Sequence, residues 1–338
     1  LECSLKNPKL IGNSFFWNAK VGMNNPLFNE RLSILVCQLL MNCGPSFLEE
    51  MFKKIVVKFK FQEMSMRAKK AYANEPRNAK DAAKQSVANS LTDLTNENLL
   101  PFSLPIDPSY YCTSFDAERT KVFDSKMVPI KIACTSSDGS ILNVMFKIGD
   151  DLRQDLLTLQ VMKIMDKMWL ENDLDLKISP YKILPTELKA GFIEFATGEV
   201  LDGLQKKEGF GGALDRELLI KHLRSVIINI NTGEVYESEK QYDNFIRSLA
   251  GYCVSTCVLG VADRHPGNVM VKSNGVFFHI DFGHILGNFK FKFGIKRERA
   301  PFLLTPEMSH VYMKTNNEEQ FKFYCTKAFN ILRHNATR

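Results

Sequence analysis

The order of apolar and polar positions divides the chain into a helical first third and a mixed remainder. Between residues 14 and 95, apolar side chains recur at the three- and four-residue spacing of helices, as Leu32 and Leu35 do, without strand-like alternation. A run rich in Lys and Met around residues 47–73 continues this pattern. We therefore predict an all-helical accessory segment over residues 1–95.

The pattern changes after a proline-containing stretch. Residues 96–109 hold three prolines and predict a linker. Beyond them, β-type runs at residues 128–133 and 141–147 are joined by the turn-forming sequence SSDG at residues 136–139. This arrangement is typical of a β-hairpin.

Helical periodicity dominates the rest of the chain. Residues 151–170 form a strongly apolar helical pattern, residues 191–195 predict a strand, and residues 215–259 are again helical in period. A second predicted hairpin pairs residues 269–271 with residues 276–280. We expect an α+β fold in which a small strand-rich lobe is followed by a larger helical lobe.

Composition narrows the class of protein only modestly. Of the 338 residues, 45% are apolar and 24% are charged, as in ordinary globular proteins, and the net charge of +6 is too small to indicate a nucleic-acid partner. The eight cysteines contain no Cys-x-x-Cys pair, which favours free thiols and a reducing compartment. No apolar run reaches the roughly 18 residues of a membrane span. The chain does not begin with Met, so we expect it to be part of a longer protein.

Two short polar motifs carry the candidate chemistry. Residues 263–268 read DRHPGN, and residues 279–283 read HIDFG. The second predicted hairpin lies between the two motifs, so their carboxylates are expected to converge. An Asp-Phe-Gly sequence alone is a weak signal, but its combination with an upstream Asp and Asn is far less expected by chance. These are parts that protein kinases use, although the order here is Asp-Arg-His and not His-Arg-Asp.

The residue types in the two motifs suit phosphoryl transfer. This reaction needs neutralisation of the phosphate charge, usually by Mg²⁺, and a group that orients or deprotonates the nucleophile. Asn268 and Asp281 supply the hard oxygen ligands that Mg²⁺ prefers. Asp263 and His265 are both candidate bases, and the sequence does not divide that role between them. We predict a phosphotransferase that depends on ATP and Mg²⁺, with Mn²⁺ as a substitute.

Three segments resemble the phosphoinositide 3-kinase and 4-kinase superfamily, which also contains related large protein kinases. They are residues 146–155 (FKIGDDLRQD), 260–265 (GVADRH) and 278–284 (FHIDFGH), and the resemblance covers roughly residues 110–330. The first segment is similar to phosphoinositide 3-kinases more than to their relatives. The resemblance implies a bilobal fold of the protein-kinase type.

The resemblance also implies domain boundaries. The sequences FWNAK and NPLF near the start are similar to the end of the helical accessory domain that precedes these kinase domains. The expected organisation is a helical accessory segment at 1–95, a linker at 96–109, a kinase N-lobe at 110–196 and a C-terminally incomplete kinase C-lobe at 197–338.

An ATP site follows from the resemblance, position by position. Lys147 would contact the ATP phosphates and act with Asp263 and His265 in catalysis, and Arg264 would hold the loop. Lys131 departs from the family, in which Trp is common at this position. The positions implied in nucleotide binding are Ser125, Lys147, Asp155, Tyr181, Glu194, Ala196, Met270 and Ile280.

The segment after the second motif points to the substrate. Five basic residues fall within ten positions, beside a single acidic residue, and they would suit an inositol phosphate head group. The pattern resembles the activation loop of class I phosphoinositide 3-kinases, which implies phosphorylation of the 3-hydroxyl of phosphatidylinositol 4,5-bisphosphate. The five basic residues are Lys290, Lys292, Lys296, Arg297 and Arg299.

Several alternatives remain open at this point. Ala300 is shared with class II loops, residues 174–181 look similar to class III enzymes, and Pro266 is found in the related protein Ser/Thr kinases. A pseudokinase scaffold is opposed by the complete set of polar motif residues. The expected partner is a phosphoinositide lipid at the inner face of the plasma membrane, reached from the cytoplasm. A regulatory subunit or a Ras-type GTPase would act through regions outside this sequence, and no nucleic acid is expected.

Overall fold

The computed structural model describes residues 1–74, 78–97, 99–123, 127–209, 211–224, 226–228, 235–237, 239–288, 291–292, 295–296 and 300–336. The chain forms two compact units. Unit 1 comprises Leu1–Leu156 and Tyr181–Phe195, and unit 2 comprises Leu157–Pro180 and Ala196–Arg338. The predicted accessory helices and the strand-rich segment thus fall in one unit, while the predicted domain boundaries stay predictions.

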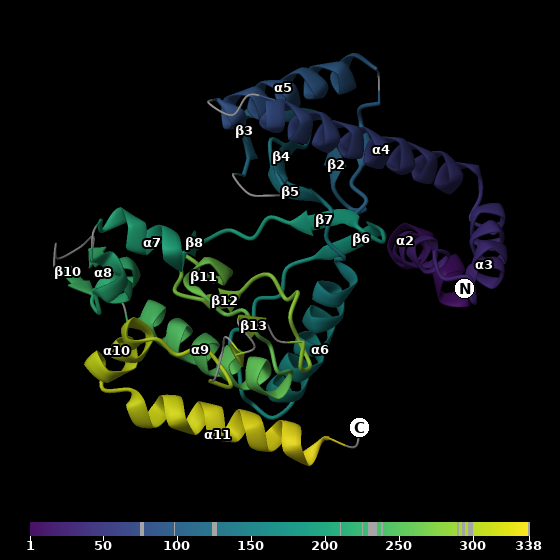
Figure 1. Ribbon diagram of the computed structural model, residues 1–338. Helices are drawn as coiled ribbons and strands as arrows, with labels where there is room; N and C mark the ends of the chain where they lie inside the picture. Colours follow the sequence, from purple (N-terminus) through teal and green to yellow (C-terminus); the bar gives the residue numbers. More distant parts are fainter. Residues whose placement is uncertain are drawn as a thin grey trace. The chain divides into compact units, whose positions relative to one another are not determined.

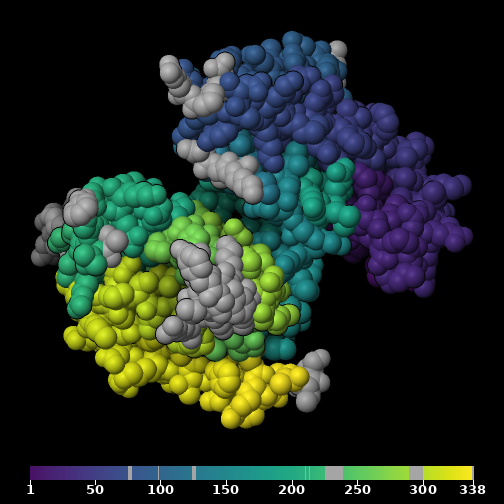
Figure 2. Space-filling model, viewed as in Figure 1, coloured from purple at the N-terminus to yellow at the C-terminus, as the bar shows by residue number. Residues whose placement is uncertain are grey.

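Helices form the first part of unit 1, as the apolar periodicity predicts. α4 and α5 pack side by side and form the blue surface at the top of Figure 2. No described helix is both long and apolar enough to cross a membrane. The helices are α1 (Glu2–Lys6), a π-helix (Pro8–Gly12), α2 (Asn13–Gly22), α3 (Asn29–Asn42), α4 (Pro45–Asn74) and α5 (Ala79–Asn96).

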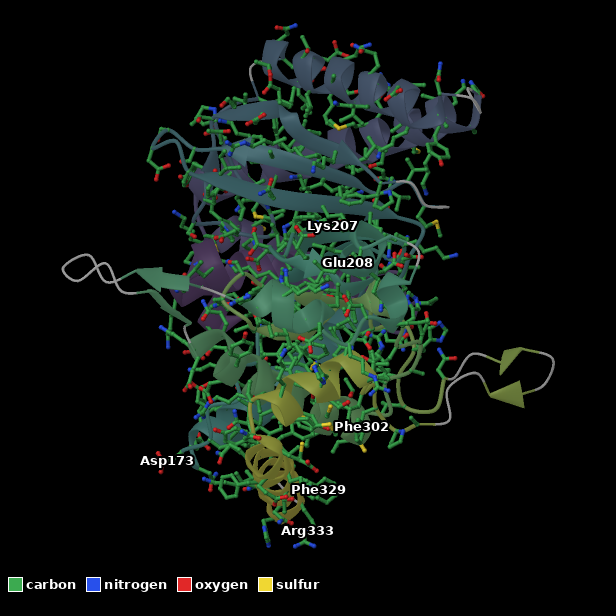
Figure 3. All side chains as sticks on the ribbon, turned by 90° about the vertical axis from the view of Figure 1, so that its left-hand side faces the viewer. Asp173, Lys207, Glu208, Phe302, Phe329 and Arg333 are labelled. Carbon is green, nitrogen blue, oxygen red and sulfur yellow. The ribbon has the colours of Figure 1, made fainter. Side chains whose placement is uncertain are left out.

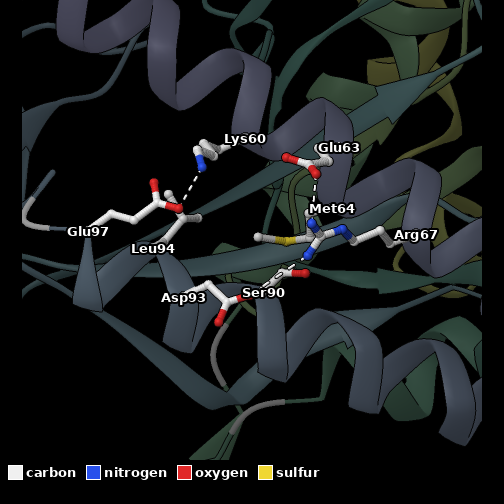
Figure 4. Close-up of a pocket in the computed structure, with 8 residues that line it drawn as sticks. All are labelled: Lys60, Glu63, Met64, Arg67, Ser90, Asp93, Leu94 and Glu97. Carbon is white, nitrogen blue, oxygen red and sulfur yellow. Dashed lines mark hydrogen bonds and ion pairs between the residues drawn. The ribbon is translucent and has the colours of Figure 1, made fainter.

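Ion pairs join α4 to α5 around a small cavity of about 40 Å³ (Figure 4). Lys60 Nζ lies 2.6 Å from Glu97 Oε1, and Arg67 lies 2.7 Å from Glu63 and 3.7 Å from Asp93. A cavity of this size holds only a few water molecules, since one needs roughly 10–15 Å³. Each of the two cations around it is therefore paired with a carboxylate of the protein.

The sheet of unit 1 has five antiparallel strands in the order β3-β4-β5-β7-β6. A two-stranded pair, β1 and β2, precedes it, and β1 lies within the predicted linker, where Phe102 is buried. The predicted first hairpin is confirmed as β4 and β5. The strands are β1 (Phe102–Ser103), β2 (Tyr111–Cys112), β3 (Ser114–Val122), β4 (Ile130–Thr135), β5 (Ile141–Ile148), β6 (Ile183–Glu187) and β7 (Ala190–Glu194).

The two faces of this sheet differ in chemistry. Alternate residues such as Ile132, Phe146 and Phe192 join the apolar core with α4, where Phe61 lies 6.1 Å from Phe146 and 5.8 Å from Phe192 between ring centroids. The strand register places Lys131 opposite Met145, so Lys131 and Lys147 belong to the other face. That face therefore carries both lysines, and Lys121, which pairs with Lys131, lies on it too.

Unit 2 is mainly helical. Its longest helices are α6 (Arg153–Leu170, beginning in unit 1), α9 (Lys240–Val258) and α11 (Glu318–His334), and the Trp169 indole on α6 donates to the Ala328 carbonyl on α11 at 3.1 Å. Phe329 and Arg333 mark α11 at the lower edge of Figure 3. The shorter helices are α7 (Leu201–Lys207), α8 (Leu218–Leu223) and α10 (Pro306–Lys314), with 3₁₀ turns at Gly212–Leu214 and Pro266–Asn268.

Short strands complete unit 2. β8 (Glu199–Val200), β11 (Val269–Val271) and β12 (Phe277–His279) form one sheet in the order β12-β11-β8, and the second predicted hairpin is thus confirmed. Separate pairs are formed by β9 (Val226–Ile228) with β10 (Val235–Glu237) and by β13 (Phe291–Lys292) with β14 (Ile295–Lys296).

One secondary-structure prediction is wrong in part. The span 215–259 was expected to be helical throughout, yet β9 and β10 lie within it. The β-branched run that forms β9 favours a strand, and its apolar residues imitate helical periodicity over so short a stretch. The predicted α+β class, with a sheet-rich part and a helical part, is confirmed.

Candidate active site

The two polar motifs of unit 2 lie side by side because of the β11–β12 hairpin. Val269 pairs with His279 and Met270 pairs with Phe278, so the chain enters β11 beside the point where it leaves β12. The Ile280 amide donates to the Asn268 carbonyl at 3.0 Å. The predicted convergence of residues 263–268 with residues 279–283 is therefore present in the structure.

Arg264 ties the two motifs together. The buried guanidinium donates through Nε to the Ala262 carbonyl at 2.9 Å and through Nη1 to the Ile280 carbonyl at 2.9 Å, and through Nη2 it bonds to the Asp281 carbonyl. A planar group with five donors can satisfy several carbonyls at once, which a lysine cannot. Arg264 thus holds the loop, in the manner that its sequence position implies.

Backbone bonds add a second connection between the motifs. The Ala262 amide donates to the His284 carbonyl at 2.8 Å, and the Leu286 amide donates to the Leu259 carbonyl at 3.0 Å. Asp263 and Asp281 both adopt left-handed backbone conformations, with φ of +58° and +60°. Such conformations are uncommon outside glycine and persist where surrounding bonds impose them.

His265 uses one ring nitrogen to hold the loop. Its Nδ1 accepts a hydrogen bond from the Gly267 amide at 3.1 Å and caps the following 3₁₀ turn. A Cβ atom at Gly267 would lie 2.9 Å from the imidazole Cε1, so glycine permits this close approach. With Nδ1 accepting, the neutral ring carries its proton on Nε2 and offers a donor there. The division of the base role between Asp263 and His265 stays a prediction.

The side chains of Asn268 and Asp281 fit the chemistry of a magnesium site. Asn268 Nδ2 donates to the Asp263 carbonyl at 2.9 Å, which leaves the amide oxygen Oδ1 as the acceptor. The Asp281 side chain is exposed, so its carboxylate is open to a ligand. Within the described ranges, no group of three or more His, Cys, Asp or Glu could hold a metal. In nucleotide sites Mg²⁺ is usually bound by one or two protein groups together with phosphate oxygens and water.

His279 is a positioning residue that the sequence motif contains but does not explain. It is 1% exposed, and its ring lies 5.2 Å from that of Phe277 and 5.5 Å from that of Tyr252. Burial, together with the nearby Arg264 charge, holds the pKa of His279 well below its ordinary value. A neutral ring can then face the guanidinium, whose Nη1 lies 3.3 Å from His279 Nδ1.

The predicted adenine floor lies in the same unit. Met270 is buried and pairs with both Phe278 and Val200, so β8 brings the segment that follows Ala196 alongside β11. Gly198 allows this approach, because a Cβ there would lie 2.9 Å from the Val271 carbonyl oxygen. Ile280 is partly buried and directly precedes the metal candidate Asp281, and its place under adenine stays a prediction.

The predicted phosphate-binding lysine belongs to unit 1. Lys147 projects from β5, opposite Gly191 on β7, and its Nζ lies 2.5 Å from Asp150 Oδ2. Asp155 and Tyr181 are 9% and 8% exposed, and each takes part in further interactions. A buried carboxylate such as that of Asp155 is unfavourable unless it has a charged or hydrogen-bonding partner.

The predicted hinge coincides with a passage between units. The chain leaves unit 1 at Phe195 and enters unit 2 at Ala196. Glu194 Oε2 accepts from the Lys182 amide at 2.8 Å, and the Phe195 amide donates to the Asn143 carbonyl at 3.0 Å. Because the Glu194 carboxylate is already bonded to the Lys182 amide, contacts to adenine at this position would come from the backbone.

Lys131, which stands where Trp is common in the family, is a further candidate for the nucleotide site. Its ammonium lies 5.2 Å from the Phe195 ring, which stacks on Phe123 at 5.8 Å between centroids. Burial, and after it the charge of Lys121, lowers the pKa of Lys131. The sequence of β4 could have indicated the face that Lys131 occupies. Successive side chains of a strand point to opposite faces, so Lys131 lies opposite the apolar Ile130 and Ile132.

Some predicted residues cannot be placed. Ser125 in the phosphate loop, and Lys290, Arg297 and Arg299 in the basic segment, lie outside the described residues. Lys292 and Lys296 are described only as members of β13 and β14. The substrate role of this segment therefore stays a prediction.

Known proteins resemble this chain over nearly its whole length. Residues 141–338 match the family described as phosphatidylinositol 3- and 4-kinase. The chain is 39% identical to phosphatidylinositol 3-kinase 1 of Dictyostelium discoideum over 96% of its residues and 20% of that protein. It is 35% identical to phosphatidylinositol 3-kinase 2 of the same organism, over 99% of its residues and 18% of that protein.

A human relative is similarly close. The phosphatidylinositol 4-phosphate 3-kinase C2 domain-containing subunit beta of Homo sapiens is 35% identical over 94% of this chain and 19% of that protein. The chain spans about a fifth of the length of the curated relatives it matches.

Proposed function

The chain belongs to the phosphatidylinositol 3- and 4-kinase family, and from this premise we propose that it is the catalytic core of a phosphatidylinositol 3-kinase. The observation that carries the proposal is the joined pair of motifs in unit 2, where Arg264 and the β11–β12 hairpin hold Asp263, Asn268 and Asp281 in one region. ATP supplies the transferred phosphoryl group, and Mg²⁺ neutralises its charge when bound.

Each polar residue then has a distinct task. Asn268 Oδ1 and the Asp281 carboxylate would hold the metal ion. Lys147 would offset phosphate charge from the sheet of unit 1. Asp263 or His265 would orient the attacking hydroxyl or take its proton, and with Nδ1 bonded to the Gly267 amide His265 would do the former, as a donor through Nε2. Positioning and charge neutralisation make up most of the catalysis in this type of reaction.

The proposed acceptor is the 3-hydroxyl of an inositol lipid, with phosphatidylinositol 4,5-bisphosphate as the leading substrate. The basic run from Lys290 to Arg299 supports this choice, because an acceptor with several phosphates needs several cations. Such a lipid would be met at the cytoplasmic face of the plasma membrane. A regulatory subunit or a Ras-type GTPase would act through further domains of the full-length protein.

A second candidate substrate is phosphatidylinositol 4-phosphate. The human relative is named for this lipid, and Ala300 matches the class II pattern. Class III activity and protein phosphorylation are further alternatives, with weaker sequence support. A scaffold without activity is opposed by the retained polar residues of both motifs.

A side-by-side assay tests the proposal. The protein, with labelled ATP and Mg²⁺, is given vesicles of phosphatidylinositol, its 4-phosphate and its 4,5-bisphosphate, together with a protein substrate. Label at the 3-position of the bisphosphate supports the leading substrate, whereas preferential labelling of the 4-phosphate supports the second. Label in protein alone would overturn the lipid assignment, and the Asp281→Asn variant controls for contaminating kinases.

A further inference from the structure

A second polar cavity lies in unit 1, away from the residues of the proposed reaction. It has a volume of about 450 Å³ and forms where α2 meets β6 and the turn that follows it. In Figure 1, α2 is seen beside the end of β6. The residues that line it are Lys20, Asn24, Thr186, Glu187, Leu188 and Lys189. This volume is within the roughly 300–1,000 Å³ of small-molecule sites.

The single carboxylate of this cavity is already neutralised. Glu187 Oε1 bonds to the ammonium of Lys58, which is 0% exposed, and Glu187 Oε2 lies 3.4 Å from Gln62 Nε2. Asp151, whose charge also acts on Lys189, is bound by Arg153 at 2.5 Å. The charges of Lys20 and Lys189 are therefore in excess around the cavity.

Lys20 has a buried ammonium group. Its Nζ is closed off from solvent and has no hydrogen-bond acceptor among the described residues, and it lies 5.2 Å from the Trp17 ring and 5.5 Å from the Phe59 ring. The buried Trp17 Nε1 likewise has no acceptor in the described part of the chain. Aromatic faces stabilise a cation only partly, and a buried charge without a hydrogen-bonded partner is unfavourable.

Burial and the nearby Lys58 lower the pKa of Lys20, while Glu187 opposes this effect. An anion in the cavity would relieve the repulsion between Lys20 and Lys58. The small cavity between α4 and α5 offers a contrast, because each cation there, Lys60 and Arg67, has a carboxylate within 2.7 Å. The larger cavity therefore differs from the smaller one in having lysine charge that no nearby carboxylate neutralises.

We propose that the cavity between α2 and the β6–β7 turn binds a phosphate group, with the exposed Lys189 as its direct contact and the charge of the Lys20 ammonium, buried behind the cavity lining, attracting it from close by. A dianionic phosphate matches the two unpaired cations, and the space beyond it accommodates the organic part of a small phosphate ester or a lipid head group. This site involves none of the residues that transfer phosphate, so it can be tested separately from the proposed function.

Inorganic phosphate is the first probe. Its binding to the purified protein is followed by ³¹P line broadening at constant ionic strength, without ATP or magnesium. Wild type is compared with Lys189→Glu, an exposed position where folding is not at risk, and with Lys20→Gln. We expect phosphate to bind about tenfold more weakly, or not at all, in both variants.

Two controls make the result specific. Lys53→Gln removes an exposed lysine paired with Glu49 on α4, and Lys147→Met removes the lysine of the proposed ATP site. Both should bind phosphate as wild type does. Equal binding by wild type and Lys189→Glu would refute the proposal, as would loss of binding in Lys147→Met alone.

A lipid arm separates the two sources of phosphate. Sedimentation with phosphatidylcholine vesicles, with and without phosphatidylinositol 4-phosphate, is measured for wild type and Lys189→Glu. A selective loss of sedimentation in the variant assigns the site to a lipid head group. Equal sedimentation, with phosphate binding still lost, assigns it to a free phosphate compound.

Discussion

The joined motifs of unit 2 and the face of the unit 1 sheet that bears Lys131 and Lys147 hold their polar groups in different ways. Asp263, Asn268 and Asp281 sit on backbone that is fixed by Arg264 and by interstrand bonds. Lys131 and Lys147 instead reach out from strands on long side chains, held by one ring contact and by an ion pair to Asp150.

This difference has a physical reason. Metal ligands need an accurate geometry, which only a rigid backbone provides. A lysine acts as a point charge on a flexible stem, so it can adapt to phosphate oxygens once they are present. We therefore expect substitutions in the loop to affect the reaction rate or folding strongly, and those on the sheet to affect nucleotide affinity more mildly.

The largest effect is expected for Asp281→Asn. Loss of the charged metal ligand should lower the phosphotransfer rate about 10³-fold, because the phosphate charge is no longer neutralised in the transition state. The rate is measured with labelled ATP, and folding is checked by thermal unfolding. A variant that keeps more than roughly a tenth of the wild-type rate would contradict the assigned metal role.

Arg264 tests whether the loop is as rigid as its bonds indicate. Arg264→Leu leaves one buried and two partly buried carbonyl groups without this donor, and we expect the free energy of unfolding to fall by about 2–4 kcal/mol. Urea denaturation measures this change. Arg264→Lys keeps the charge and should recover part of the stability, whereas full stability in the leucine variant would show that the backbone bonds alone suffice.

Lys131 tests the expectation that substitutions of the sheet lysines affect nucleotide affinity only mildly. In Lys131→Met we expect KM for ATP to rise about fivefold with little change in kcat, since Lys131 shares its sheet face with Lys147, and a charge that favours ATP binding equally in the ground and transition states affects KM alone. Lys121→Met is the matched control, because Lys121 is the exposed partner of Lys131 in the β3–β4 register. An equal rise in KM for both variants would mean a general charge effect.

The smallest effect concerns His222 on α8. Burial is the main cause that lowers the pKa of His222, and the Lys207 charge adds to it against Glu199. Below a pH of about 6.5 the unfolded chain binds a proton that the folded protein takes up only at lower pH, so stability is lost as the pH falls. In wild type this contributes a slope of at most about 1.4 kcal/mol per pH unit.

His222→Gln should remove this contribution to the pH dependence of the free energy of unfolding. Urea denaturation from pH 7.5 down to pH 5.5 gives the two curves, and His279 contributes equally to both. Parallel curves throughout this range would remove His222 as a source of acid sensitivity. Above pH 7.5 no difference in slope is expected.

Much of the fold followed from local patterns. The helices α4 and α5, the two hairpins and α6 are long or strongly periodic, so neighbouring residues alone indicate them. The β9–β10 pair was missed because three residues per strand carry too little periodicity. The joining of residues 263–268 to residues 279–283 was foreseen for the same local reason, since a tight hairpin must return the chain to its starting point.

The sequence by itself determined which groups this protein has for its chemistry: the carboxylates, the amide and the lysine stand in short, specific motifs. Only the tertiary structure decided how they are held. The bonds from Arg264 to the Ile280 and Asp281 carbonyls, the burial of His279 and the contact of Lys131 with Phe195 depend on residues that lie apart in the sequence. No local pattern contains such contacts, because side-chain packing between separate elements creates them. The unmatched lysines beside α2 are another such case, since their charge becomes significant only where the β6–β7 turn closes a cavity over them.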